Sequence, residues 1–241
     1  MGRFILLLVV FSVLCAGMSS SAGPAQSTER TRLLAEIGSL RNKLNTRERE
    51  FLSPTDEDRA AFATFLAAPD TGLIRLMPRL GGEHQSKLSV RGGGAYYSFS
   101  RLTHEYGYGS DIQLENGSFS VGFAGADHGW LAIVGNVPLE SVNLETPEVA
   151  FLSSMVTPSR MPQAREQQQR SSYGVEQEGI IYKRTVGATV GFTYLLRSIN
   201  YDTSDVLVAF RVVRRDNDGS LILLWKMLRQ FPGPTLVRDG N

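Results

Sequence analysis

The segments that decide the fold are residues 206–213 (VLVAFRVV), 216–219 (DNDG) and 221–228 (LILLWKML). The two outer runs are rich in aliphatic, β-branched and aromatic residues, which are typical of β-strands. The segment between them consists of residues that favour turns. We therefore predict an antiparallel hairpin. Because both of its faces carry large apolar side chains, we expect it at the centre of a sheet that is covered on both sides.

Side-chain pairing indicates the register of this hairpin. A four-residue loop over 216–219 places Phe210 opposite Trp225, with apolar pairs on either side. A tighter loop would place Arg211 opposite Lys226, and like charges facing each other destabilise a sheet. The four-residue loop is therefore favoured.

The N-terminus has the organisation of a secretory signal peptide. A short basic end, 1–3, precedes an apolar run over 4–14 and then small residues from Cys15 onward. We expect export, with cleavage after Gly17 or Ala22. The alternative is that the segment stays attached as an uncleaved membrane anchor. Since Cys15 is the only cysteine, the mature chain would contain no disulfide.

Composition and element order predict an α+β fold. We expect a signal peptide over 1–22, a linker and an N-terminal helical pair over 23–72, a mainly antiparallel β-domain with short helical insertions over 73–231, and a tail over 232–241. The net charge is +1 and the basic residues are dispersed. Nucleic-acid binding, which needs a clustered basic face, is therefore not expected.

The first predicted helix, over 28–52, carries an apolar stripe formed by Leu33, Ile37, Leu40 and Leu44. Two interpretations of this face remain open. It packs on the chain's own domain, or it binds a protein partner or a second copy of this chain. A second helix is expected to begin after Thr55, because Thr55 and Asp58 have the spacing of a capping box.

A second hairpin is predicted around Asn116–Gly117, the dipeptide that best fits a two-residue type I′ turn. With Glu115 opposite Ser118, one face of this hairpin is apolar and the other is polar. A half-solvated antiparallel sheet has this pattern.

The residues that flank this hairpin form the only group in the sequence that suggests a binding site. If the hairpin forms, its open end brings together the candidate ligand-binding residues Tyr108, Asp111, Asp127, His128 and Trp130. Aromatic rings with a few polar groups are typical of small-ligand or sugar sites. The alternative is a glycine-rich connection with ordinary packing aromatics.

No motif for a serine nucleophile, a phosphate loop or a metal ion is present. We therefore expect no catalytic residue, metal or cofactor. The sequence favours an exported non-catalytic protein, structural or ligand-binding, in the cell envelope or outside the cell. The alternative is a secreted hydrolase, acting for instance on glycans, with a site near Asp111, Asp127 and His128.

Overall fold

The computed structural model describes residues 24–79, 87–107 and 109–237. The chain divides into two compact units, Met1–Leu44 and Asn45–Asn241. Helix α1 (Pro24–Leu52) begins in the first unit and ends in the second. The predicted signal peptide lies outside the described residues. Among those residues, no helix combines the length and the apolar character needed to span a membrane.

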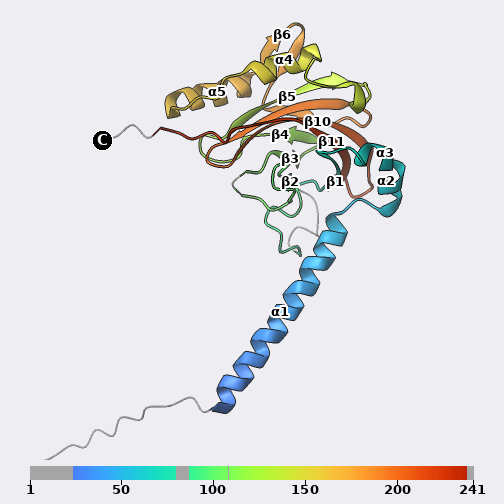
Figure 1. Ribbon diagram of the computed structural model, residues 1–241, viewed down its shortest axis with the longest axis vertical. Helices are drawn as coiled ribbons and strands as arrows, with labels where there is room; N and C mark the ends of the chain where they lie inside the picture. The colour runs from blue at the N-terminus through green and yellow to red at the C-terminus, as the bar shows by residue number, and fades with distance from the viewer. Residues whose placement is uncertain (1–23, 80–86, 108, 238–241) are drawn as a thin grey trace, which may run out of the picture. The chain divides into compact units, whose positions relative to one another are not determined.

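A five-stranded antiparallel sheet forms the centre of the second unit (Figure 1). Its order is β1-β11-β10-β9-β5, so the β10–β11 hairpin is central, as its two apolar faces predicted. The strands are β1 (Thr71–Leu76), β5 (His128–Gly135), β9 (Thr193–Asn200), β10 (Ser204–Arg215) and β11 (Leu221–Phe231).

A second sheet, of order β2-β3-β4-β8, covers one face of the first. Its strands are β2 (Tyr96–Tyr97), β3 (Ile112–Glu115), β4 (Ser118–Ser120) and β8 (Thr185–Gly187). The predicted hairpin is confirmed, because Glu115 faces Ser118 and both turn residues have positive φ, 50° at Asn116 and 70° at Gly117. The apolar face of this sheet packs against the central hairpin through side chains that include Phe119 and Phe210.

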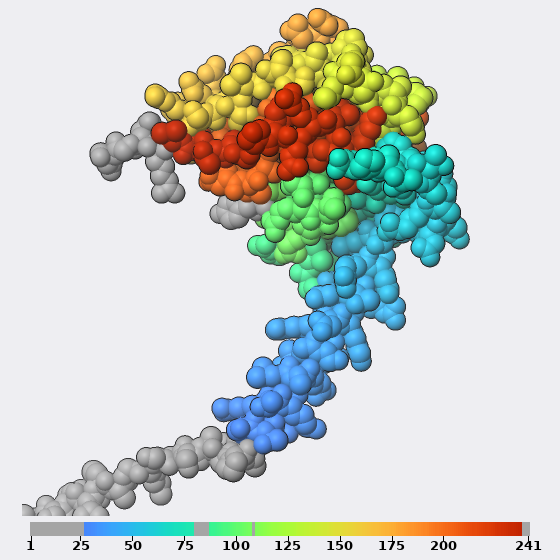
Figure 2. All heavy atoms as spheres, viewed as in Figure 1, coloured from blue at the N-terminus to red at the C-terminus, as the bar shows by residue number. Residues whose placement is uncertain are grey.

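The opposite face of the five-stranded sheet is covered mainly by helices. Its apolar side chains pack with Val149 and Leu152 of α4 and with Phe62 and Phe65 of the α2–α3 segment. Figure 2 shows residues 147–173, in yellow, as a layer along the red strand β11. The covering elements are α2 (Asp56–Ala61), α3 (Ala63–Leu66), η1 (Leu139–Ser141), α4 (Pro147–Ser154), α5 (Met161–Tyr173), β6 (Val175–Gln177) and β7 (Ile180–Tyr182).

The α+β class and the antiparallel sheets are thus confirmed. The capping box at Thr55 is also present, since Thr55 N donates to Asp58 Oδ2 and Asp58 N donates to Thr55 Oγ1, each at 3.1 Å. The helix that follows is not continuous. It is divided at Phe62, whose φ of −110° lies outside the helical region, into α2 and α3.

The predicted register of the central hairpin is confirmed over five successive pairs, from Val208 opposite Met227 to Val212 opposite Leu223. It is wrong at both ends of that run, where β-bulges shift the pairing. At the loop end, Arg214 rather than Val213 faces Ile222, and Arg215 faces Leu221. The connection is closed by Asp216 N donating to Ser220 O at 2.9 Å.

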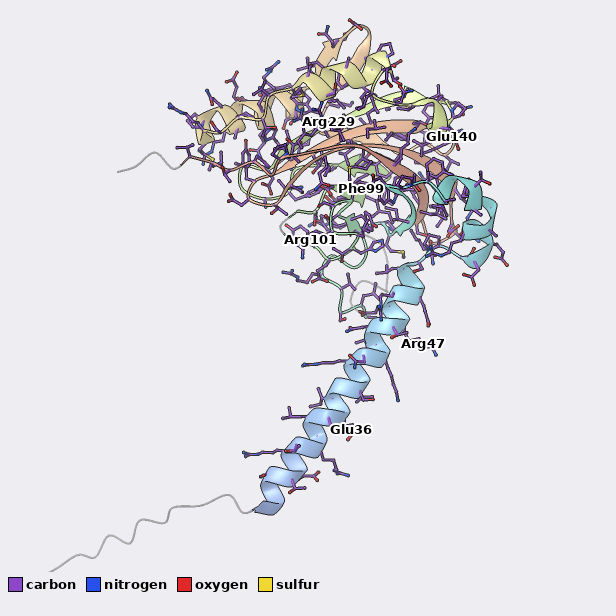
Figure 3. The ribbon with its side chains drawn as sticks, viewed as in Figure 1. Glu36, Arg47, Phe99, Arg101, Glu140 and Arg229 are labelled. Carbon is purple, nitrogen blue, oxygen red and sulfur yellow. The ribbon has the colours of Figure 1, made fainter. Side chains whose placement is uncertain are left out.

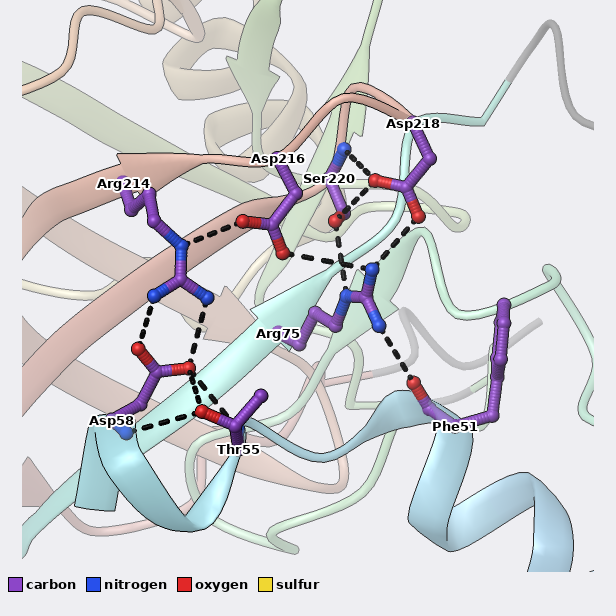
Figure 4. Close-up of polar contacts among 8 residues, drawn as sticks. All are labelled: Phe51, Thr55, Asp58, Arg75, Arg214, Asp216, Asp218 and Ser220. Carbon is purple, nitrogen blue, oxygen red and sulfur yellow. Dashed lines mark hydrogen bonds and ion pairs between the residues drawn. The ribbon is translucent and has the colours of Figure 1, made fainter. Parts of the chain in front are cut away.

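The bulge at Val213 has a physical reason in the charges around Arg214. An extra residue in one strand moves all later side chains to the opposite face. Arg214 thereby leaves the side that faces the apolar core between the sheets and ion-pairs with Asp58 of α2 (Figure 4). The loop carboxylates are likewise bound by arginines, since Arg75 Nη2 lies 2.8 Å from Asp218 Oδ2 and 3.6 Å from Asp216 Oδ2.

Trp225 provides a test of the central hairpin, because its side chain is buried between the two sheets. Trp225→Ala should lower the free energy of unfolding by about 3–5 kcal/mol, since it removes a large apolar surface and leaves a cavity. Tyr173→Ala is the matched control, because Tyr173 is 82% exposed and its loss should change stability by less than about 0.5 kcal/mol. Chemical denaturation measures both. Equal effects of the two substitutions would contradict this packing.

Candidate functional site

The outer face of the four-stranded sheet is polar and forms a groove of about 680 Å³, within the usual range of ligand pockets. It lies opposite the apolar face that packs on the central hairpin, because successive side chains of a strand alternate between faces. The lining residues are Arg79, Tyr96, Tyr106, Gln113, Glu115, Ser120, Phe123, Ser172, Lys183, Arg184 and Thr185.

Three aromatic rings form one wall of the groove. The ring centroid of Tyr96 lies 4.4 Å from that of Tyr106 and 5.2 Å from that of Phe123, the second pair edge to face. Gly92 permits this cluster, because its φ is +85° and a Cβ there would lie 2.5 Å from the Tyr96 ring and 2.9 Å from Tyr106 Cβ. Burial raises the pKa of the Tyr96 hydroxyl, so this group stays protonated at neutral pH.

Cations outnumber carboxylates in the groove. Arg79 Nη1 lies 3.2 Å from Glu115 Oε1, so this pair is largely neutralised. Arg184 is held in place through its Nε, which donates to the carbonyl oxygen of Val121 at 3.0 Å. Lys183 is exposed and forms no ion pair with any other described residue. The groove thus presents net positive charge beside an aromatic wall.

The sequence alone did not reveal this groove. Strand β8 pairs with β4, with Ser120 opposite Thr185, so Lys183 and Arg184 join the site from a distant part of the chain. Only half of the site was visible in the sequence, as the polar face of the Asn116–Gly117 hairpin. A sequence pattern that could have indicated the other half is the pair of adjacent cations at 183–184, directly before an alternating strand.

Asp111, one of the sequence-predicted site residues, is fully buried next to the β9–β10 turn. Its Oδ1 accepts a hydrogen bond from Asn200 Nδ2 at 2.8 Å, and its Oδ2 accepts one from the backbone N–H of Phe99 at 2.7 Å. Despite these hydrogen bonds, burial raises the pKa of the Asp111 carboxyl to about 6.

Asp127 and His128 both contact Tyr201, the residue that follows Asn200 in the same turn. Asp127 Oδ1 accepts a hydrogen bond from the backbone N–H of Tyr201 at 2.9 Å, and the His128 ring centroid lies 5.9 Å from that of Tyr201. Burial raises the pKa of the Asp127 carboxyl to about 6 and lowers the pKa of His128. Since His128 Nδ1 lies 3.1 Å from the carbonyl oxygen of Ala126, the neutral ring carries its proton on Nδ1.

Of the other two predicted residues, only Trp130 is described, and it does not join this cluster. Trp130 lies in the core beneath the helices, with its ring 6.2 Å from that of Phe151. Tyr108 lies outside the described residues. Neither Asp111 nor Asp127 lines the groove. Within residues 24–79, 87–107 and 109–237, no cluster of three or more His, Cys, Asp or Glu is suited to hold a metal ion.

The buried carboxyl of Asp111 predicts a specific pH dependence. Its pKa is higher in the folded chain than in the unfolded chain, so the folded state binds this proton more tightly. Its contribution to stability is therefore present below about pH 4 and is lost as the pH rises to about 6. The loss is at most about 2–3 kcal/mol.

Asp111→Asn should remove this contribution while Asp127 keeps its own. The free energy of unfolding, measured by denaturant titration between pH 4 and pH 7, should therefore fall less steeply for the variant than for the native chain. Parallel curves for the two proteins would show that the Asp111 carboxyl does not titrate in this window.

Two regions of polar chemistry therefore lie on the side of the four-stranded sheet: the open, cationic and aromatic groove, and the buried carboxyls at the β9–β10 turn. Only the first is open to a ligand. Comparison of this chain with protein-family models, curated proteins and solved structures found no match.

Proposed function

We propose that this chain is an exported, non-catalytic ligand-binding protein of the cell envelope or the extracellular space. Its ligand is a small polar molecule that carries a ring and an anionic group, and it binds in the groove on the four-stranded sheet. The observation that carries this proposal is the convergence of Lys183, Tyr106 and Phe123 on one open hollow of ligand size. A ring can stack on the aromatic wall while the exposed ammonium group neutralises the anion.

The residues that line the groove favour binding over catalysis. Among the described residues that line it there is no histidine, and its single carboxylate, Glu115, is paired with Arg79. General acid–base chemistry needs a titratable group with an adjusted pKa at the substrate. The described lining of the groove offers hydrogen bonds and positive charge, but neither a histidine nor an unpaired carboxylate that could act as general acid or base.

The alternative, a secreted hydrolase acting through Asp111, Asp127 and His128, has one observation in its favour. Both carboxyls have raised pKa values, as the acid of a glycosidase does. Against it, Asp111 is fully buried and each carboxyl already accepts a backbone N–H hydrogen bond. Asp127 is buried as well, so neither carboxyl is open to a substrate, and we prefer the binding function.

Export is supported by the composition of residues 1–22, with a basic end, an apolar run and small residues. In this proposal the N-terminal helical pair consists of α1 and the α2–α3 segment. Cleavage leaves a chain without cysteine, so it needs no oxidative folding.

Mass spectrometry of the protein from a host that secretes it should show the loss of the first 17 or 22 residues. These masses correspond to cleavage after Gly17 or Ala22, where small side chains fit the processing site. Recovery of the intact N-terminus from the soluble fraction of the cytosol would contradict export. Recovery of the intact chain in the membrane fraction would support the anchored alternative.

Ligand binding can be tested with three anionic probes: glucuronic acid, N-acetylneuraminic acid and inorganic phosphate. Nuclear magnetic resonance titration of the chain from Gly23 should give saturable shifts at groove residues, larger for the sugar acids than for phosphate because only the sugars have a ring to stack. Lys183→Ala should weaken binding by roughly fivefold or more, because a charge-assisted contact contributes about 1–3 kcal/mol.

Arg165→Ala is the matched control, because Arg165 is an exposed cation on α5 that does not line the groove. It should leave the affinity unchanged. No shift with any of the three probes, or equal loss of affinity in both variants, would overturn the assignment of the groove. Methyl glucoside, which is neutral, should bind more weakly than glucuronic acid.

A further inference from the structure

The apolar stripe of helix α1 is exposed in the first unit. Leu33, Ile37, Leu40 and Leu44 are each between 43% and 56% exposed, and Leu34 beside them is 69% exposed. These side chains recur at steps of four, three and four, so they lie on one side of the helix. An exposed apolar stripe of this kind indicates a surface that is covered by a partner.

The spacing of the four residues fits the a and d positions of a coiled coil, which form the seam where its helices touch. Leu33 and Leu40 occupy d positions, and Ile37 and Leu44 occupy a positions. Of the two a residues, Ile37 is β-branched, and a β-branched residue at a with leucine at d favours a parallel two-stranded coil. Gly38, which weakens the helix, falls at a b position away from the seam, and a Cβ at Gly38 would meet nothing within 4 Å.

Charges beside the seam fit a second copy of the same helix. In a parallel, in-register dimer each g residue faces the e residue five positions later on the partner. Glu36 at g would then face Arg41 of the other copy, and the symmetry repeats this attractive pair. Within the described residues Glu36 and Arg41 take part in no ion pair of their own, and Figure 3 shows Glu36 projecting from the helix.

The next pair of charged residues beside the seam limits the length of this coil. Lys43 at g would face Glu48 at e, but the Glu48 carboxylate is already bound by Ser89, whose Oγ donates to Glu48 Oε2 at 2.6 Å. Glu48 is 4% exposed and belongs to the second unit. The seam therefore ends near Leu44, which makes a short coil.

We propose that α1 forms a parallel, in-register two-stranded coiled coil with α1 of a second copy of this chain, through Leu33, Ile37, Leu40 and Leu44. In this arrangement the Glu36–Arg41 pairs between the copies are attractive. The contact joins two copies of the chain, and it does not depend on what the groove binds. With so short a seam, the dimer dissociates on dilution.

Sedimentation equilibrium of the chain from Gly23 over a concentration series tests the proposal. The native chain should associate to a dimer. Glu36→Arg and Arg41→Glu should each weaken association by roughly tenfold, because each replaces two attractive pairs by two repulsive ones. Ser39→Glu is the matched control, since position 39 is a c position on the outer face of the coil. It should leave association unchanged.

Mixing the two single variants gives the decisive result. A heterodimer of Glu36→Arg and Arg41→Glu restores both attractive pairs only if position 36 of one copy faces position 41 of the other. In the antiparallel coil that buries the same four apolar residues, Glu36 would face Lys43 of the other copy, both at g positions. Arg41→Glu alone would then leave association unchanged, and the mixture would keep one repulsive pair. We therefore expect the mixture, and the double variant alone, to associate as the native chain does.

A native chain that remains monomeric throughout the series would overturn the proposal. So would native-strength association of both single variants, Glu36→Arg and Arg41→Glu. Failure of the mixture to associate would overturn the parallel arrangement. Circular dichroism checks that each variant keeps its helix, and tryptophan fluorescence unfolding checks that the β-domain, where both tryptophans lie in β5 and β11, is unaffected.

Discussion

The ion pair between Arg197 and Asp205 is the interaction on which the layered structure depends. It is bidentate, with Arg197 Nε 3.0 Å from Asp205 Oδ1 and Nη2 2.9 Å from Oδ2, and both side chains are buried. Arg197 Nη1 also donates to the carbonyl oxygens of Leu152 and Met155, where α4 ends. Removing one member of such a buried pair generally destabilises by about 3–5 kcal/mol. The pair therefore joins β9 and β10 to the helical layer.

The same strand fixes the other layer, because its alternate side chains point the other way. Asn200 of β9 binds Asp111, and Asp111 directly precedes β3. This hydrogen bond fixes the point where β3 begins. Within β3, Ile112 and Leu114 enter the core, and alternation places Gln113 and Glu115 on the outer face, where they line the groove. A buried polar contact thus positions the candidate binding surface without taking part in it.

The sequence predicted the structures that depend on pairing between neighbouring segments. The central hairpin and the Asn116–Gly117 turn follow from apolar alternation and turn residues, and both registers hold where the strands are regular. The bulge at Val213 did not follow, because its cause is the charge of Asp58, which lies far away in the sequence. The groove was missed for the same reason, since the β4–β8 pairing joins segments that no local pattern connects.

The buried carboxyls show why a raised pKa is insufficient to identify an active site. Burial disfavours the charged form of any carboxyl, whether or not a substrate can reach it. Asp111 has a pKa of about 6 because it is enclosed between sheets, and its hydrogen bonds all serve the fold. In the groove, Lys183 is exposed, and the rings of Tyr106 and Phe123 are half-buried. Because a ligand must be able to enter its site, access favours the groove over the carboxyls as the proposed place of binding.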